Sequence, residues 1–275
     1  MKVGINFMQP PLISVIMGVY YRDHNIALLK RSVQSILEQS MVNLELLICD
    51  NGSVPEACTF LNAQAASDLR IRLIRKDNCF TLPAKLNLCL LQAKGTWVAR
   101  MDDDDYAHPE RLKCQLKYLQ THTKIAFVGC NVDLWCGGQI VGQRCFPEFP
   151  QVNDFYITQP FIHPALLFRR TALEAVGGYS EDRHCILCED YDLLLRLYTK
   201  GLQGANLQEK LLEYTVPSTV KGNRRFSHRI NECVTRFVRF KELGLLPSAY
   251  PYVMKPLIVG LLPAFVLKQL KGLSQ

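Results

Sequence analysis

The sequence has no long uninterrupted apolar stretch, no internal repeat and no low-complexity tract. The apolar run from Leu12 to Tyr20 follows two prolines and is closed by Arg22 and Asp23 without a small-residue cleavage site, which argues against a secretory signal. The segment from Tyr250 to Leu273 is interrupted by prolines and by Lys255, whereas a membrane span needs about 20 apolar residues. We therefore expect a cytoplasmic protein whose last segment either packs on the domain or lies on a membrane surface.

The 11 cysteines lack the regular spacing of a disulfide framework, so reduced thiols are expected. Cys185 and Cys188 form a C-x-x-C pair beside His184. A zinc site needs four ligands, and no second ligand pair stands at a suitable spacing. Chance in a cysteine-rich chain explains this pair better than metal binding.

Charge is unevenly distributed along a chain whose formal net charge is +7. Acidic residues concentrate in 102–105 and 188–192, and basic residues in 221–229 and 236–241. No helix-turn-helix, zinc-finger or aromatic RNA-binding pattern accompanies the bases, so nucleic acid is not an expected partner. An anionic membrane surface or a phosphate-bearing substrate fits them better.

With 275 residues and 48% hydrophobic content, the chain can bury one large core, with or without a small appendage. Strand candidates alternate with amphipathic helix candidates, which predicts an α/β fold with a mostly parallel sheet flanked by helices. The expected strands are Leu12 to Tyr20, Leu44 to Cys49, Ile71 to Ile74, Trp97 to Met101, Ile125 to Gly129 and Leu166 to Phe168.

The helix candidates follow from capping signals and from apolar spacing. We expect Asp23 or Asn25 to cap the first helix, and Ser53-x-x-Glu56 to form a capping box at the start of the second. Further helices are expected around Leu86 to Ala93, from Pro109 through Leu119, at Thr171 to Val176, at Glu189 to Lys200, and from Ser227, where Ile230, Val234, Phe237 and Val238 would face inward.

Four consecutive carboxylates, Asp102 to Asp105, follow the fourth strand. If the backbone stays extended, Asp102 and Asp104 point the same way and can share one hard cation. Ligands of open α/β sheets bind beyond the carboxyl ends of strands, so Asp50 at the end of the second strand is expected in the same crevice. The alternative is an acidic surface turn neutralised by nearby bases.

The sequence resembles glycosyltransferase family 2 over roughly Ile13 to Leu197. Four motifs occur in family order: Ser14 to Tyr20, which resembles the first strand; Cys49-Asp50-Asn51-Gly52-Ser53, which resembles the D-D-G-S turn; Ala99 to Asp105 with Pro109 to Leu112, which resembles the D-x-D segment and its helix; and His163-Pro164 to Arg170, Gly177-Gly178-Tyr179 and Glu189 to Leu193, which resemble the acceptor-side region. Gly18 and Asn51 depart from the usual proline and second acid.

The resemblance implies the GT-A fold, which is Rossmann-like, and transfer of a sugar from a UDP-sugar with inversion. It implies that the donor is bound by Val19, Tyr20, Asp50, Asn51, Arg100, Asp102 and Asp103. Asp104, with Asp102, is the expected ligand of a Mn or Mg ion, which acts as a Lewis acid on the departing diphosphate. Asp190 is the expected catalytic base, and Glu189 beside it is expected to contact substrate. Repulsion from Glu189 and Asp192 would raise the pKa of Asp190.

Two further departures shape the expected reaction. The R-x-H-P stretch that many members carry after the base is replaced by Tyr214-Thr215-Val216-Pro217, so Lys221, Arg224 or Arg225 could take over the diphosphate charge. The Q-x-x-R-W motif of processive members is absent, so one sugar is expected per encounter. His163 is more readily explained by a local backbone bond than by metal binding.

The resemblance divides the chain into a GT-A domain, residues 1–220, with a nucleotide-binding half up to 120 and an acceptor half from 121. Residues 221–275 form a C-terminal helical tail that could touch an anionic membrane. The expected acceptor is a lipid-linked saccharide at the inner face of the cell membrane, in O-antigen, capsule or exopolysaccharide biosynthesis. The alternatives are a Mg-dependent phosphoryl-transfer enzyme and a non-catalytic nucleotide-sugar binding protein.

Overall fold

The computed structural model describes residues 11–76, 79, 81–217 and 226–261. Its strands are β1 (Ile13–Val19), β2 (Leu44–Asp50), β3 (Ile71–Ile74), β4 (Trp97–Arg100), β5 (Tyr106–Ala107), β6 (Phe127–Cys136), β7 (Gln139–Arg144), β8 (Leu167–Arg169) and β9 (Gly204–Thr215). Its helices are α1 (Ala27–Leu37), α2 (Pro55–Ser67), α3 (Leu82–Gln92), α4 (Arg111–Thr121), α5 (Arg170–Ala175), α6 (Glu189–Thr199), α7 (Phe226–Glu242) and α8 (Tyr250–Leu261), with short 3₁₀ turns at Val152–Tyr156, His163–Ala165 and Arg183–Cys185.

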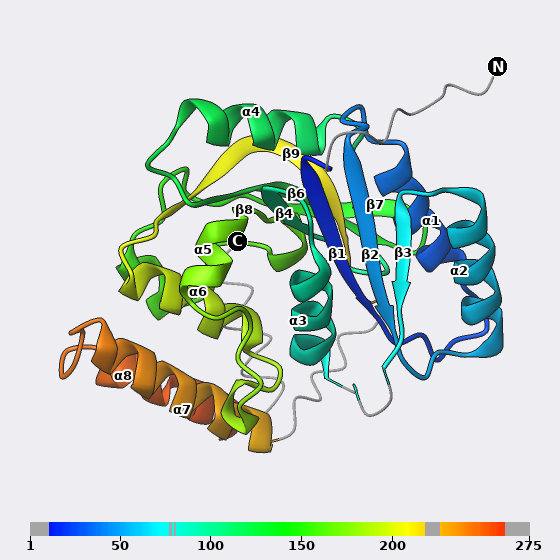
Figure 1. Cartoon of the computed structure of the whole chain (residues 1–275). Helices are drawn as coiled ribbons and strands as arrows, with labels where there is room; N and C mark the ends of the chain where they lie inside the picture. Colours follow the sequence, from blue (N-terminus) through cyan, green and yellow to red (C-terminus); the bar gives the residue numbers. More distant parts are fainter. Residues whose placement is uncertain (1–10, 77–78, 80, 218–225, 262–275) are drawn as a thin grey trace.

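The strands form one sheet in the order β3-β2-β1-β4-β8-β6-β9-β5, with β7 paired to β6 (Figure 1). β1 is parallel to both β2 and β4, and β3 is parallel to β2. β8 joins this parallel half to β6 through antiparallel pairs, and β6 is again parallel to β9. The expected α/β fold is therefore confirmed, and the carboxyl ends of β1, β2 and β4 lie at one edge of the sheet.

Alternation along β1 divides the apolar residues between two cores. Ile13, Val15, Met17 and Val19 pack with the apolar residues of α1, α2 and α4. Ile16 faces the opposite way and packs with residues of α3, α5 and α6. This period of two is what a strand buried on both faces requires. Helices therefore cover both sides of the sheet and leave its carboxyl edge open for ligand-binding side chains.

The start of α2 differs from the expected capping box. The helix begins after Val54, and no side chain caps its first amides. The hydroxyl of Ser53 instead donates to Asp50 and accepts from the backbone N–H of Tyr21 at 2.9 Å. The hydroxyl of Ser53 is used in this way because the buried carboxylate of Asp50 and the N–H of Tyr21 need a hydrogen-bond partner. The first amides of α2 can instead bond to water. At the first helix, Asn25 does accept from Ala27 at 3.2 Å.

The face that α7 buries also differs from the expectation. Ile230, Phe237 and Val238, expected to face inward, are exposed, whereas Thr235, Arg236 and Phe240 are buried. Contacts with α6 accompany this orientation, because the guanidinium of Arg236 lies 4.7 Å from the centroid of the Tyr191 ring and Arg239 pairs with the buried Asp192. The apolar stripe of α7 therefore points away from the core.

Two strands of the second half, β7 and β9, were not expected from the sequence, and β6 is longer than expected. β7 and the extension of β6 beyond Gly129 form a hairpin whose turn uses Gly137 and Gly138 at φ of 57° and 97°. β9 contains Glu209 and Lys210 among leucines, a composition that favours helix. Its parallel pairing with β6 overrides that local preference.

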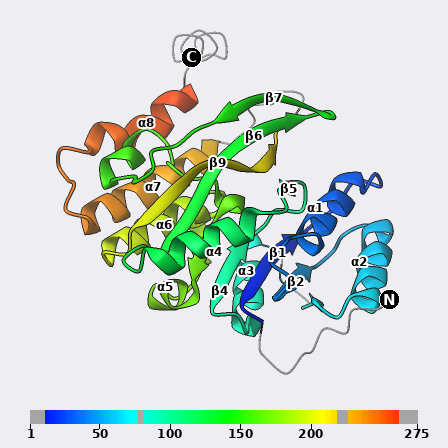
Figure 2. The same ribbon diagram turned by 90° about the horizontal axis from the view of Figure 1, so that it is seen from above.

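The pair α7 and α8 lies at the opposite end of the molecule from α1 and α2 (Figure 2). These two helices pack against each other, and α7 packs in addition against α6 and the short turn at Arg183–Cys185. No helix in the described part of the chain combines the length and apolar character needed to cross a membrane.

Candidate active site

The first part of the site lies where β1 and β2 end side by side. Val19 is the register partner of Asp50, so both stand at the same level of the sheet edge. Asp50 is buried and accepts from Ser53, with Arg75 Nε at 3.8 Å. Its position is therefore fixed by the turn that follows β2.

Tyr20 presents an aromatic ring beside these strand ends. Its side chain is 47% exposed, and Arg22 both lies 4.6 Å from the ring centroid and donates to the hydroxyl at 2.9 Å. On the other side Lys85 Nζ lies 5.0 Å from the centroid and donates to Val19 O at 2.5 Å. Gly52 packs so closely that an added Cβ would lie 3.3 Å from the ring. The ring is thus held in place by these contacts, and nearly half of the side chain remains exposed.

Asn51, which stands where the second acid was expected, makes local contacts. Its Nδ2 donates to the backbone oxygens of Lys76 at 3.0 Å and Cys79 at 3.2 Å. These bonds tie the end of β2 to the segment after β3. An aspartate could not donate them, because an ionised carboxylate is only an acceptor. Compared with an aspartate, Asn51 therefore lacks a negative charge but links the two loops through its hydrogen bonds.

The acidic run lies beyond the end of β4, in a bend of the chain. β4 ends at Arg100, so the expected strict alternation of extended carboxylates does not apply. Asp105 is fully buried and accepts from Thr215 N at 2.7 Å, while Thr215 Oγ1 donates to Asp104 O at 2.5 Å. Asp102, Asp103 and Asp104 are partly exposed. The end of β9 therefore holds the run so that its first three carboxylates face outward.

The four carboxylates repel one another. Burial, followed by the charge of Asp102, raises the pKa of Asp103 to about 6, of Asp104 to about 7 and of Asp105 to about 9. Oδ2 of Asp105 is in addition buried without a hydrogen-bond partner. Such a group is stabilised by protons or by a cation. Carboxylate oxygens suit a hard ion such as Mg²⁺ or Mn²⁺.

The positions of the neighbouring bases do not support the alternative of an acidic surface turn that these bases neutralise. Arg100 is fully buried and forms an ion pair with Asp102. Arg111 is also buried and donates to Arg100 O at 2.8 Å, and Lys113 pairs with Glu110 at 2.9 Å instead. Asp102 is thus the carboxylate of the run that pairs with one of these bases. Arg100 acts on the site through this ion pair.

Among the described residues, no group of three or more His, Cys, Asp or Glu side chains is arranged to hold a metal ion. The carboxylates of the run can supply part of a coordination shell. The remaining oxygen ligands would have to come from water or a substrate. That requirement is ordinary for Mg²⁺, which is commonly bound by one or two carboxylates together with substrate phosphates.

A cavity of about 430 Å³ opens beside the acidic run. Asp102 contributes to its wall, and so does Asp190 from the first turn of α6. The other wall residues are Leu82, Arg144, Ile157 to Gln159, Phe161 to Pro164, Leu187 to Glu189, Tyr191, Tyr214, Glu232 and Arg236. The structure thus brings Asp102 and Asp190, 88 positions apart by their residue numbers, into one cavity.

Asp190 is oriented by contacts to both of its carboxylate oxygens. Gln159 Nε2 donates to Oδ2 at 3.0 Å, and Tyr191 N donates to Oδ1 at 2.8 Å. Glu189 beside it is mostly buried, and burial together with the charge of Asp190 raises the pKa of Glu189 to about 7. The sequence contained no signal that identified Gln159 as a neighbour of Asp190.

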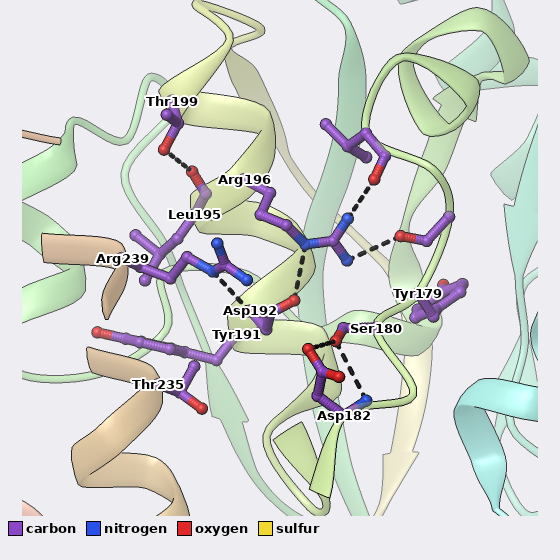
Figure 3. A network of polar contacts seen from close by, with 12 residues as sticks. Tyr179, Ser180, Asp182, Tyr191, Asp192, Leu195, Arg196, Thr199, Thr235 and Arg239 are labelled. Atoms are coloured by element: carbon purple, nitrogen blue, oxygen red, sulfur yellow. Dashed lines mark hydrogen bonds and ion pairs between the residues drawn. The ribbon is translucent and has the colours of Figure 1, made fainter. Parts of the chain in front are cut away.

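Asp192 holds the start of α6 in place. It is fully buried and accepts from Arg196 Nε at 2.7 Å and from Arg239 Nε at 2.7 Å (Figure 3). Arg196 also donates to the backbone oxygens of Val176 and Gly178. The expected repulsion between Asp192 and Asp190 is therefore offset, because two arginines compensate the charge of Asp192. Its contribution is to position the turn that carries Asp190.

His163 has a side-chain partner rather than the expected backbone bond. Its Nε2 lies 2.8 Å from the hydroxyl of Tyr179. Burial and the charge of Arg100 hold the pKa of His163 well below its usual value, so the imidazole is neutral. Cys185 and Cys188 are free, buried thiols. Lys221, Arg224 and Arg225, proposed from the sequence as diphosphate ligands, lie outside the described residues.

Comparison with known proteins gives consistent matches. Residues 14–177 match the family described as glycosyl transferase family 2. EpsE of Bacillus subtilis, named as a glycosyltransferase, is 34% identical over 94% of this chain and 92% of its own length. AmsE of Erwinia amylovora, named as an amylovoran biosynthesis glycosyltransferase, is 24% identical over 94% of this chain and 97% of its own.

Solved structures are similar in fold at low sequence identity. TarS 1–349 of S. aureus in complex with UDP-GlcNAc gives a TM-score of 0.67 at 17% identity, over 88% of this chain and 72% of that one. The mannosyltransferase PcManGT of Pyrobaculum calidifontis, in complex with GDP-Man and Mn²⁺, gives 0.58 at 18% identity, over 96% and 80%. These likenesses confirm the expected GT-A-like fold.

Proposed function

This chain belongs to glycosyltransferase family 2, and from that premise we propose that it transfers a sugar from a UDP-sugar to a saccharide acceptor with inversion, assisted by Mn²⁺ or Mg²⁺. The observation that carries the proposal is the cavity in which Asp190 and the acidic run meet through Asp102. A donor diphosphate at the run and an acceptor hydroxyl at Asp190 would then be neighbours, as a single displacement requires.

We assign the donor to the strand ends. The partly exposed side chain of Tyr20 is assigned to the nucleotide base, and the carboxylate of Asp50 can accept the N–H of uracil beside Val19. Asn51 positions the neighbouring loop through its two backbone bonds. Arg100 positions Asp102 through the ion pair between them. The structural neighbours TarS and PcManGT are described in complex with UDP-GlcNAc and GDP-Man respectively. We propose UDP here from the resemblance, with Asp50 as the hydrogen-bond partner of the uracil N–H.

Asp104 and Asp102 are the proposed ligands of the cation, with Asp103 beside the donor. When bound, a divalent ion neutralises charge that develops on the leaving diphosphate. The raised pKa values of Asp103 and Asp104 fit this assignment, since the repulsion behind them is relieved by a cation. The hard oxygen donors of the run fit Mn²⁺ and Mg²⁺ equally well.

Asp190 is the proposed base that removes the proton of the acceptor hydroxyl. The bonds from Gln159 and Tyr191 fix its orientation, so the carboxylate need not reorganise during the reaction. Glu189, with its pKa raised to about 7, holds a proton for part of the time at neutral pH and can then donate a hydrogen bond to a sugar oxygen.

Release of UDP tests the proposal. Full-length protein is incubated with Mn²⁺ and, in parallel, with UDP-glucose, UDP-galactose, UDP-GlcNAc and GDP-mannose, and the freed nucleoside diphosphate is quantified. We expect slow hydrolysis of at least one UDP-sugar that stops when EDTA removes the metal. Release of GDP alone would contradict the UDP assignment, and release that is insensitive to EDTA would contradict the metal.

We further propose that the acceptor is a lipid-linked saccharide of cell-surface polysaccharide biosynthesis, handled at the inner face of the membrane. The relative AmsE is named for amylovoran biosynthesis. In this chain, α7 exposes an apolar stripe of Phe226, Ile230, Phe237 and Val238, and α8 exposes one of Tyr250, Met254, Ile258 and Leu261. The two stripes meet where the rings of Phe237 and Tyr250 lie 6.4 Å apart. We call these eight residues the hairpin face.

An anionic membrane surface is the occupant that we propose for the hairpin face. The chain continues from α8 with a further apolar sequence, residues 262–275, whose only charged residues are Lys268 and Lys271. Exposed apolar side chains that are followed in the sequence by an apolar, lysine-containing segment are typical of a peripheral membrane contact. Such a contact would bring the cavity close to the lipid that carries the acceptor.

Charged substitutions on the hairpin face test this contact. We expect Phe237→Glu and Ile258→Glu each to weaken binding to phosphatidylglycerol vesicles by about tenfold or more, because each removes a side chain whose burial contributes about 1.5–3 kcal/mol. Co-sedimentation with vesicles measures the effect. Leu91→Glu, an exposed leucine on α3, is the matched control. Unchanged vesicle binding of both variants, or their conversion of a dimer into a monomer in sedimentation velocity, would exclude a membrane role.

A further inference from the structure

Arg144 is an uncommitted cation in the wall of the cavity. It is the last residue of β7, is exposed, and lines the cavity together with Asp102 and Asp190. Within the described residues its side chain forms no hydrogen bond and no ion pair. The second arginine of the wall, Arg236, is buried, pairs with Glu232 at 3.1 Å and donates to Tyr156 O at 3.0 Å. Arg144 therefore has a charge available for a ligand.

Strand pairing directs Arg144 toward the cavity. Arg144 lies opposite Val132 of β6, and Tyr214 of β9 lies opposite Leu134. Since Val132 and Leu134 are two residues apart, Arg144 and Tyr214 project from the same face of the sheet. Burial and the charge of Asp102 raise the pKa of Tyr214 to about 12, and the opposing effect of Arg144 on that pKa is consistent with this proximity.

The position of Arg144 places it on the acceptor side of the reaction. Tyr20, Asp50 and Asn51, assigned above to the nucleotide, are not part of the cavity wall. The wall instead contains Asp190, Gln159 and the loop around Ile157. Of the donor and metal residues assigned above, only Asp102 lies in this wall, so we assign a ligand group that contacts Arg144 to the molecule that receives the sugar.

The acidic residues of the wall do not prevent an anion from binding. Asp102 is paired with Arg100, and Glu232 is paired with Arg236. Glu189 is partly protonated at neutral pH, because its pKa is raised to about 7. The cavity is consequently less negative than its composition indicates, and among the described residues no carboxylate forms an ion pair with Arg144.

We propose that Arg144 binds an anionic group of the acceptor, a phosphate or a carboxylate, close to the hydroxyl that receives the sugar. This inference rests on the proposed glycosyltransferase function and adds the chemical class of the acceptor. The planar guanidinium matches both anions in two-point hydrogen bonds. The anionic group has two candidate sources. A phosphate would come from a diphosphate lipid carrier, and a carboxylate would come from an acidic sugar.

Binding of three small probes to the full-length protein, saturated with UDP and Mn²⁺, tests the proposal by ligand-observed NMR. The probes are methyl β-glucoside, methyl β-glucuronide and glucosyl methyl phosphate, which are neutral, carboxylated and phosphorylated respectively. We expect wild-type protein to bind one anionic probe about tenfold more tightly than the neutral one, as a charged hydrogen bond allows. The preferred anion identifies the source.

The variants then assign the preference to Arg144. Arg144→Ala should bind the anionic and neutral probes equally, and Arg144→Lys should retain part of the preference, because it keeps the charge and loses the planar fork. Lys117→Ala, which removes an exposed cation from α4, should behave as wild type. Equal binding of all probes by wild type, or a preference that survives Arg144→Ala, would overturn the inference.

Nucleotide binding separates this inference from the function on which it rests. Arg144→Ala should bind UDP in the presence of Mn²⁺ as wild type does, because the donor contacts lie elsewhere. A matching loss of UDP affinity would place Arg144 at the donor and refute the acceptor assignment. If wild type itself binds no UDP, the proposed function fails, whereas normal UDP binding with no anion preference rejects only the role of Arg144.

Discussion

Replacing Asp190 by asparagine is expected to reduce sugar transfer by about 10³-fold while donor affinity stays within about twofold of wild type, because a positioned base typically contributes 10²–10⁴-fold. Asparagine has nearly the same shape and keeps an oxygen to accept from Tyr191 or Gln159. It cannot take a proton from the acceptor hydroxyl. Steady-state transfer rates, with UDP affinity measured by calorimetry, check both halves of the expectation.

Glu189→Gln is the matched control for Asp190→Asn. It removes the adjacent carboxyl, which lines the same cavity, and leaves the base intact. We expect this control to lose about tenfold or less of the transfer rate, which is the scale of one hydrogen bond. Near-normal turnover of Asp190→Asn would remove Asp190 from its role, and a larger loss in Glu189→Gln would move the base to the neighbouring residue.

Replacing Asp104 by asparagine should weaken donor binding that depends on the metal by about 100-fold, since even outer contacts of a metal site typically change affinity 10–100-fold. The carboxylate of Asp104 is partly exposed, and its pKa is raised to about 7 by burial and by Asp102, the conditions that a cation would relieve. Titration of UDP with Mn²⁺ present, and again after EDTA, measures the metal-dependent part.

Two comparisons make the Asp104 result specific. With EDTA, wild type and Asp104→Asn should bind UDP equally, because only the bridging ion distinguishes them. Glu110→Gln, an exposed carboxyl close to the same run, should leave the Mn²⁺ effect unchanged. Undiminished Mn²⁺ affinity of Asp104→Asn would refute the choice of ligand, and Asp102 would then be the remaining candidate.

The strands of the first half were predictable because two signals agreed: the apolar composition of each strand and the polar residues that follow it. β1 and β2 are apolar runs followed by polar residues, as expected of parallel strands buried on both faces. β4 was found in the same way, and its end located the acidic run. The strand register, with Val19 beside Asp50, follows from parallel pairing and places these two residues at one edge of the sheet.

The second half was less predictable because its local preferences conflict with its final pairing. β9 has the leucine, glutamate and lysine content of a helix and becomes a strand through its contact with β6. α7 has an apolar stripe that would normally face inward, yet it turns Arg236 and Arg239 toward α6. Arg239 pairs there with the buried Asp192, a residue distant in sequence.

The sequence by itself determined the family, the α/β class and the residue types of the site, because motifs and periodicity are local properties of the chain. Only the tertiary structure decided that Asp102 and Asp190 share one cavity, that Arg144 lies in its wall, and that the apolar side of α7 faces outward. These features depend on contacts between segments far apart in the chain, such as β7 with β6 and α7 with α6. The energies of these contacts depend on both partner segments, so they cannot be inferred from either segment alone.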